Sequence, residues 1–152
     1  DESHIIRTIE YWDIERKRYP QYEHCAVIIA EEITSRFLNV IGLFNYDPMV
    51  VTEEMSEIVA SISVATYPLN KEKTSFKMAC AFQSPKDKFN KRQGHFISTR
   101  RLLTASNNRK SILIIEKSED KKLIDSIKKG CITIAQNMNI KWMKAFSIEN
   151  LK

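Results

Sequence analysis

The sequence predicts an α+β protein in which helices flank a mixed sheet, with an N-terminal α-β-α portion followed by a β-β-α-β-α portion. Three observations predict this class. Apolar residues recur at helical spacing in several segments, short β-branched runs separate those segments, and one stretch alternates apolar with polar residues. With 43% of its 152 residues hydrophobic, the chain can build one sizeable core, so we expect a single compact body over residues 1–152.

The first 45 residues are expected to form a helix, a buried strand and a second helix. An apolar stripe over residues 3–16, capped by Ser3 and ended by Pro20, predicts the first helix. The β-branched centre of residues 24–31 predicts a strand that is buried on both faces. A second helix is expected to begin at residue 33 or 34, with one apolar face formed by Phe37, Leu38, Ile41 and Phe44.

A β-hairpin is expected next, because residues 58–67 and 75–82 both alternate in the manner of half-buried strands. Ser84-Pro85 then predicts the start of a helix, since proline is tolerated in a first turn. The apolar face of that helix is expected to carry Phe89, Phe96, Ile97 and Leu103.

The last predicted elements are a short buried strand over residues 111–115 and a helix over residues 119–137. Gly130 weakens this helix by roughly 1 kcal/mol relative to alanine, which allows a break there. The apolar residues 140–148 fit either a helix or a strand.

Composition excludes several classes of protein. The longest apolar runs fall far short of the roughly 20 residues that span a bilayer, and no signal peptide is visible, so we expect a cytoplasmic protein without membrane association. Cys25, Cys80 and Cys131 are widely spaced in apolar segments, which is typical of buried thiols. The motifs of common nucleotide-binding and hydrolase sites are absent, and no cysteine or histidine has a partner at metal-ligand spacing, so no metal site is expected.

Charge divides the chain into two unlike parts. Residues 1–70 contain 5 Lys/Arg against 12 Asp/Glu, a net charge of −7, whereas residues 71–152 contain 19 against 7, a net charge of +12. Such asymmetry indicates either a polyanionic partner or two surfaces that attract each other.

The basic charge is densest over residues 86–110, where eight cations face one acid, Asp87. On a helix, neighbouring cations can meet successive phosphates, while Gln93, Gly94 and His95 could add hydrogen bonds or a close backbone approach. A solvated helix face is the alternative explanation. The candidate nucleic-acid-binding residues are Lys86, Lys88, Lys91, Arg92, Arg100, Arg101, Arg109 and Lys110.

The aromatic and histidine side chains could each have a functional or a purely structural role. Phe82, Phe89 and Phe96 could stack bases, as in single-strand binders, but the spacing of Phe89 and Phe96 is more typical of a core. His4, His24 and His95 are expected to be surface or hydrogen-bonded residues rather than metal ligands.

Residues 4–45, above all IEYWDIERKRYP followed by AVIIAEEITSRFLNVI, resemble a branch of the PD-(D/E)XK restriction-endonuclease-like nucleases. The resemblance implies the helix, strand and helix that follow the catalytic strand of such enzymes, and, in an active member, Mg²⁺-dependent endonuclease activity. The family's metal-binding Asp and its (D/E)-x-K tripeptide precede this block, and Asp1-Glu2-Ser3 lacks the lysine. No catalytic residue is therefore carried over, and Glu10 alone matches a supporting carboxylate, with a solvated helix glutamate as the alternative.

The second part of the chain, with SFKMACAFQSPKDKFNKRQGHFISTRRLL, is similar to small phage-encoded proteins of uncharacterised function, which implies no chemistry. The chain opens without methionine, so we expect residues upstream of it. A composite of a nuclease-like segment 1–48 and a basic α+β segment 49–152 is the alternative to one body.

The sequence thus favours a nucleic-acid-binding protein, with DNA the expected partner, whose nuclease-like N-terminal portion has no identified catalytic residues. The alternative is a non-enzymatic phage-type accessory or protein-interaction factor that acts as a homodimer through its oppositely charged parts. No cofactor is expected, except Mg²⁺ if the chain is a nuclease.

Overall fold

The computed structural model of the chain describes residues 3–7, 32–42, 58–84, 87–103, 110–143 and 146–152. Its strands form one five-stranded sheet in the order β1-β2-β3-β4-β5, so strands that follow one another in the chain are neighbours in space. Every pairing between them is antiparallel, whereas the sequence predicts a mixed sheet. The elements are β1 Ser3–Arg7, β2 Glu32–Ile41, β3 Ile58–Pro68, β4 Ser75–Phe82, α2 Lys91–Leu103, β5 Ile112–Glu116, α3 Leu123–Asn137, η2 Lys141–Met143 and η3 Ile148–Asn150.

The α+β class is confirmed, and so is the β-β-α-β-α order of the second portion. The strands β3, β4 and β5 match the expected ranges within one residue. α3 begins at Leu123 rather than at residue 119 and runs through Gly130 without a break. In the described part of the segment 140–148, the structure has the short 3-10 helix η2 and the start of η3, in place of the helix or strand that was expected.

Two predictions about the N-terminal portion are wrong. The helix expected from residue 33 or 34 is instead β2, and Ser3–Arg7 forms the strand β1 rather than the first turn of a helix. β2 is a central strand with buried residues on both faces, and such strands lack the polar alternation that distinguishes a strand from a helix. The strand predicted over residues 24–31 lies outside the described residues, together with Glu10, His24 and Cys25.

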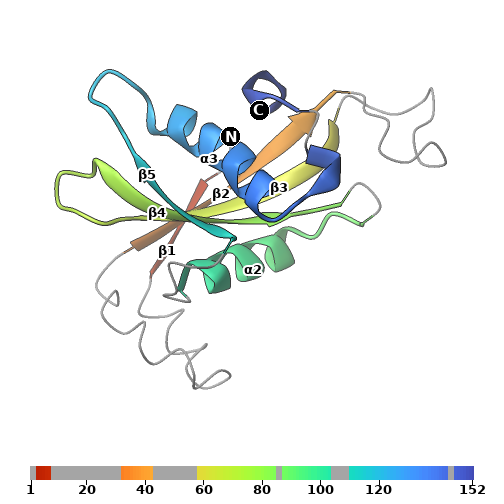
Figure 1. Ribbon diagram of the computed structural model, residues 1–152. Helices are drawn as coiled ribbons and strands as arrows, with labels where there is room; N and C mark the ends of the chain where they lie inside the picture. The colour runs from red at the N-terminus through yellow and green to blue at the C-terminus, as the bar shows by residue number, and fades with distance from the viewer. Residues whose placement is uncertain (1–2, 8–31, 43–57, 85–86, 104–109, 144–145) are drawn as a thin grey trace.

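The sheet is covered by α2 on one face and by α3 on the other (Figure 1). The pairing register assigns the strand residues to these faces. Leu38 lies opposite Ile62, which lies opposite Phe82, and these apolar residues face α3. Phe37 lies opposite Ser63, which lies opposite Ala81, and these residues face α2. The residues named on the α3 face are large and apolar, whereas small and polar residues lie among those on the α2 face.

The core on the α3 side is built from aliphatic, aromatic and sulfur-containing residues. Ile127, Cys131 and Ile134 of α3 are fully buried against the sheet. Full burial of such an aliphatic side chain contributes about 1.5–3 kcal/mol. Gly130 brings α3 close to β4, because a Cβ atom at this position would lie 2.3 Å from the Met78 sulfur.

The α2 side packs through small residues. Gly94 lies against the Phe37 ring and Ser63, where an added Cβ would be 2.9 Å and 3.2 Å from the nearest atoms. The hydroxyls of Ser63 and Ser98 are hydrogen-bonded at 2.9 Å, although both side chains are buried. α2 contacts the sheet through glycine and serine. The sequence of this helix therefore shows only a weak pattern of apolar residues at helical spacing.

The C-terminal residues complete the α3 side. Leu151 is fully buried and forms an isolated antiparallel bridge with Val40 of β2. The backbone nitrogen of Asn39 donates to the Lys152 carbonyl at 2.8 Å, and that of Lys152 donates to the Asn39 carbonyl at 3.0 Å. The end of the chain is therefore fixed to β2.

β2 and β3 lie on either side of residue 48 and pair over most of their length. The described parts of segments 1–48 and 49–152 thus share one sheet. Among the residues that the structure describes, none of the helices has the length and apolar character to cross a bilayer.

Cys80 and Cys131 confirm the expectation of buried thiols, with their sulfur atoms 3.7 Å apart. Burial, together with the hydrogen bond and charge of Cys131, raises the pKa of the Cys80 thiol well above its usual value. The folded protein therefore keeps this thiol neutral at pH values where the unfolded chain, with a cysteine pKa of about 8.5, has lost the proton.

We expect the free energy of unfolding to be unaffected by Cys80 below pH ~8 and to fall above pH ~8.5, by about 1.4 kcal/mol per pH unit until the folded thiol also ionises. Urea unfolding at neutral and alkaline pH measures this decline. The control is Cys80→Ala, which should flatten it. If the free energy of unfolding fell equally in both proteins, the decline would arise from ionisable groups other than Cys80.

Candidate functional site

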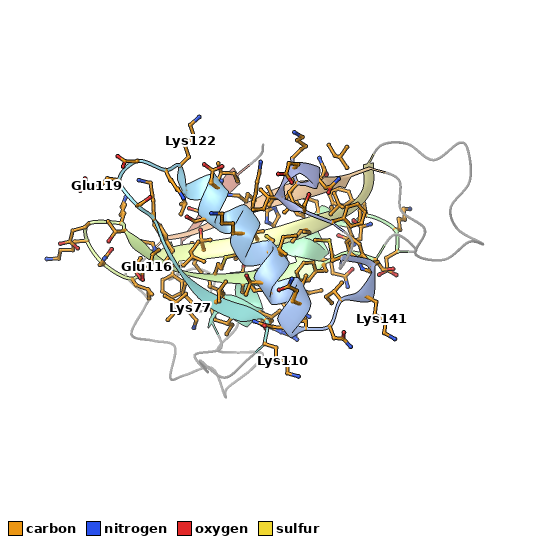
Figure 2. All side chains as sticks on the ribbon, turned by 45° about the horizontal axis from the view of Figure 1, so that its top comes forward. Lys77, Lys110, Glu116, Glu119, Lys122 and Lys141 are labelled. Carbon is orange, nitrogen blue, oxygen red and sulfur yellow. The ribbon has the colours of Figure 1, made fainter. Side chains whose placement is uncertain are left out.

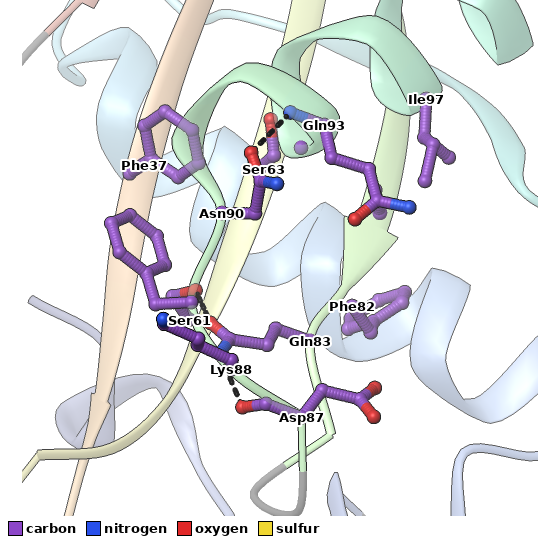
Figure 3. A pocket seen from close by; sticks show the side chains of 13 residues that line it. Phe37, Ser61, Ser63, Phe82, Gln83, Asp87, Lys88, Asn90, Gln93 and Ile97 are labelled. Atoms are coloured by element: carbon purple, nitrogen blue, oxygen red, sulfur yellow. Dashed lines mark hydrogen bonds between the residues drawn. The ribbon is translucent and has the colours of Figure 1, made fainter.

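A cavity of about 340 Å³ lies at the start of α2, where β2, β3 and the end of β4 meet the loop that precedes the helix. Figure 3 shows the side chains around it. β2, β3 and β4 supply its floor, and the loop and the first turns of α2 supply its rim. The lining residues are Phe37, Ser61, Ser63, Ala81, Phe82, Gln83, Asp87, Lys88, Phe89, Asn90, Gln93, Gly94 and Ile97.

α2 begins at Lys91, so the predicted start at Ser84-Pro85 is wrong. Asn90 explains the later start. Its side-chain oxygen accepts a hydrogen bond from the Gln93 backbone nitrogen at 3.0 Å, and its carbonyl accepts one from the Gly94 nitrogen at 3.0 Å. Asparagine in this position satisfies a backbone donor that the first turn leaves unpaired. Residues 87–90 therefore form a loop at the cavity rather than a turn of helix.

Hydrogen bonds hold the loop against β3. The Ser61 hydroxyl donates to the side-chain oxygen of Gln83, and the Gln83 amide donates to the Asp87 carbonyl at 2.8 Å. The Gln83 backbone nitrogen also donates to the Ser61 carbonyl at 3.0 Å. Two of these three bonds use the Gln83 side chain, which therefore connects the end of the sheet to the loop and shapes one wall of the cavity.

Aromatic rings form the opposite wall. The rings of Phe37 and Phe89 meet edge to face, with centroids 5.5 Å apart. Phe89 is 53% exposed, so the expectation that it belongs to the core is wrong. The reason is the later start of α2, which places Phe89 in the loop before the helix. Phe96 is half-buried on the helix and does not line the cavity.

Three of the candidate basic residues lie close together at this site. Lys88 lines the cavity and is exposed, and Arg92 is exposed on the first turn of α2. Lys91 is half-buried, with its ammonium group 5.9 Å from the centre of the Phe37 ring. Asp87 is the acidic residue among the lining side chains. Residues 87–92, the loop and first residues of α2, therefore have an excess of positive charge.

The other candidates are more scattered. Arg100 packs over the Phe96 ring, 5.7 Å from its centroid, further along α2. Arg101 donates a hydrogen bond to the Cys80 carbonyl at 2.7 Å, which gives it a structural task in fixing α2 to β4. Lys110 is exposed and projects outward just before β5 (Figure 2). Lys86 and Arg109 lie outside the described residues.

His95 is hydrogen-bonded through its Nδ1 atom to the Ser35 hydroxyl, and its ring meets the Phe37 ring at a centroid distance of 4.6 Å. This confirms the expectation of a hydrogen-bonded histidine. Across the described ranges, no three histidine, cysteine or acidic side chains form a group that could hold a metal ion.

Sequence patterns missed four cavity residues, namely Phe37, Ser61 and Ser63 in the strands and Gln83 directly after β4. The alternation of serine with aliphatic residues over 61–64 was a usable signal, because small polar residues on one face of a strand allow a helix to approach closely. Neither a family model nor a curated protein nor a solved structure matches the chain.

Proposed function

We propose that the chain binds nucleic acid at the start of α2. The observation that supports this function best is the exposure of Lys88 and Arg92 beside a cavity with polar and aromatic walls. Lysine and arginine neutralise phosphates without regard to sequence, whereas a cavity that offers rings and amides can recognise a base. The +12 charge of residues 71–152 supports attraction to a polyanion from a distance.

The binding of labelled single-stranded and duplex DNA across a salt series tests this function. Affinity should fall steeply as salt rises, because each neutralised phosphate releases counterions. Absence of binding at low salt would contradict the proposal. RNA of the same sequence, run in parallel, shows which nucleic acid is preferred.

The nuclease-like N-terminal portion remains a prediction that the same samples can test. Adding Mg²⁺ and separating the DNA on a denaturing gel shows whether strands are cut. Cleavage that requires Mg²⁺ would support a metal-dependent endonuclease, whereas intact DNA in the presence of binding would support a binding protein without this activity.

Self-association is the second candidate function, and β5 favours it. This strand forms an edge of the described sheet, and its Ile114 side chain is 50% exposed. An exposed apolar edge strand is a template for pairing with another strand. Two copies that paired through β5 would extend the sheet and cover Ile114.

If the chain dimerises in this way, Ile114→Lys should convert the dimer to a monomer, because a charged side chain on an edge strand opposes pairing. Light scattering measures the mass of both proteins. Ser118→Lys, beyond the end of β5, is the control and should leave the dimer intact. A mutant that stays dimeric would place the interface elsewhere.

A further inference from the structure

We infer that the cavity at the start of α2 holds one unpaired nucleobase, so that the chain prefers single-stranded to duplex nucleic acid. This inference rests on the proposed nucleic-acid binding and adds which part of the strand enters the cavity. Four observations support it: the volume of the cavity, its aromatic wall, the side-chain amide of Gln93, and two exposed cations nearby.

The cavity has the dimensions of a small-ligand site. Its volume of about 340 Å³ falls at the lower end of the range of about 300–1,000 Å³ that is usual for such sites. A base in a duplex is stacked and paired and cannot enter a cavity of this kind, whereas an unpaired base can leave its neighbours at little cost. The geometry therefore selects for a single strand.

Phe89 supplies an exposed ring at the rim. A large apolar side chain that is 53% exposed gains free energy when a flat ligand covers it. The Phe89 ring has an edge-to-face contact with the Phe37 ring, which also has an edge contact with the His95 ring. Stacking on an aromatic ring suits any base, since every base has a flat π face.

Gln93 supplies a side-chain amide that is available to hydrogen-bond a ligand. Its side-chain amide has no hydrogen-bond partner among the described residues, and Figure 3 shows it extending between Ile97 and Phe82. An amide offers donors and an acceptor together, which matches the paired donors and acceptors on the edge of a base. By contrast, the Gln83 amide is already bonded and serves to shape the cavity.

Lys88 and Arg92 lie on opposite sides of Phe89 in the sequence and are both exposed. A base that stacks on Phe89 would bring its own phosphates to the rim of the cavity, which Lys88 lines and which lies beside the first turn of α2 with its exposed Arg92. Stacking and phosphate contact would therefore act on the same nucleotide, which is the combination found in single-strand binding sites.

The test compares Phe89→Ala with Phe96→Ala for binding to a short oligothymidylate and to a duplex of the same length. Phe96 is a matched control, because it is a half-buried phenylalanine on the same segment that does not line the cavity. We expect Phe89→Ala to weaken single-strand binding by about tenfold and duplex binding by less than about twofold. Phe89→Trp should retain single-strand binding, and thermal unfolding verifies that every variant is folded.

The outcomes separate the inference from the function on which it rests. Salt-dependent binding of both DNA forms, with equal affinity and no weakening in Phe89→Ala, would overturn the base-binding cavity and leave the proposed function standing. Equal weakening in Phe89→Ala and Phe96→Ala would also overturn it. If the native chain binds neither DNA form at low salt, the proposed function fails and the inference fails with it.

Discussion

A Gly130→Val variant is expected to unfold with a free energy about 1–3 kcal/mol lower than that of the native sequence. The Cβ atom would lie 2.3 Å from the Met78 sulfur and 3.3 Å from a methyl carbon of Ile115. Met78 is fully buried, and a close-packed protein interior leaves little space into which it could turn. α3 must therefore move away from β4 or distort the core, and either change weakens the packing on this face of the sheet.

Thermal or urea unfolding measures the effect, with an expected fall in Tm of roughly 2–4 °C per kcal/mol for a chain of this size. The matched control is Lys129→Val, at the neighbouring exposed position of α3. It introduces the same β-branched residue into the same helix without meeting Met78. Helix propensity alone would destabilise Lys129→Val slightly and stabilise Gly130→Val, because valine is a poorer helix former than lysine and a better one than glycine. A Gly130→Val protein as stable as the native one would therefore refute the close approach of α3 to β4.

Reversing the charge of two cations, in a Lys88→Glu/Arg92→Glu variant, is expected to weaken binding to single-stranded DNA on the order of 10- to 100-fold at low salt. In this variant, two side chains that attract phosphate at the proposed site are replaced by two that repel it. The slope of affinity against salt should also become shallower, by about 0.7 for each phosphate of a single strand that the protein no longer neutralises.

Lys121→Glu/Lys122→Glu is the control for this prediction, because it changes the net charge equally. Both lysines are exposed in the loop before α3, and Figure 2 shows Lys122 projecting from that region. The pairing of Ser75 with Glu116 places this loop at the end of β4 opposite to Gln83 and the cavity. Equal weakening in both double variants would mean that the overall charge attracts DNA without a defined site.

Whether a strand could be recognised from the sequence depended on the residues that its two faces require. β3 was recognised because Ser61 and Ser63 alternate with Ile62 and Val64, and this alternation exists because α2 packs on the serine face. β2 has apolar residues on both faces, where Phe37 is followed directly by Leu38. Their spacing fitted a helical stripe equally well, so periodicity alone could not identify the strand.

The candidate site was predicted in part, and the errors have a common cause. The basic residues were grouped by their proximity in the sequence, but the contacts that each makes depend on residues far away in the sequence. Arg101 reaches a carbonyl of β4, 21 residues earlier, while Lys88 remains exposed. The start of α2 at Lys91, fixed by Asn90, removed Phe89 from the helix and changed it from an expected core residue to a rim residue of the cavity.

The most direct test of the central claim is the location of bound nucleic acid on the protein, measured by amide hydrogen exchange with and without a saturating single-stranded oligonucleotide. If the strand binds at the start of α2, exchange should slow in residues 87–97 and in the adjoining part of β3, and remain unchanged in α3 and β5. Protection confined to α3 or β5, with residues 87–97 unaffected, would contradict a binding site at this cavity.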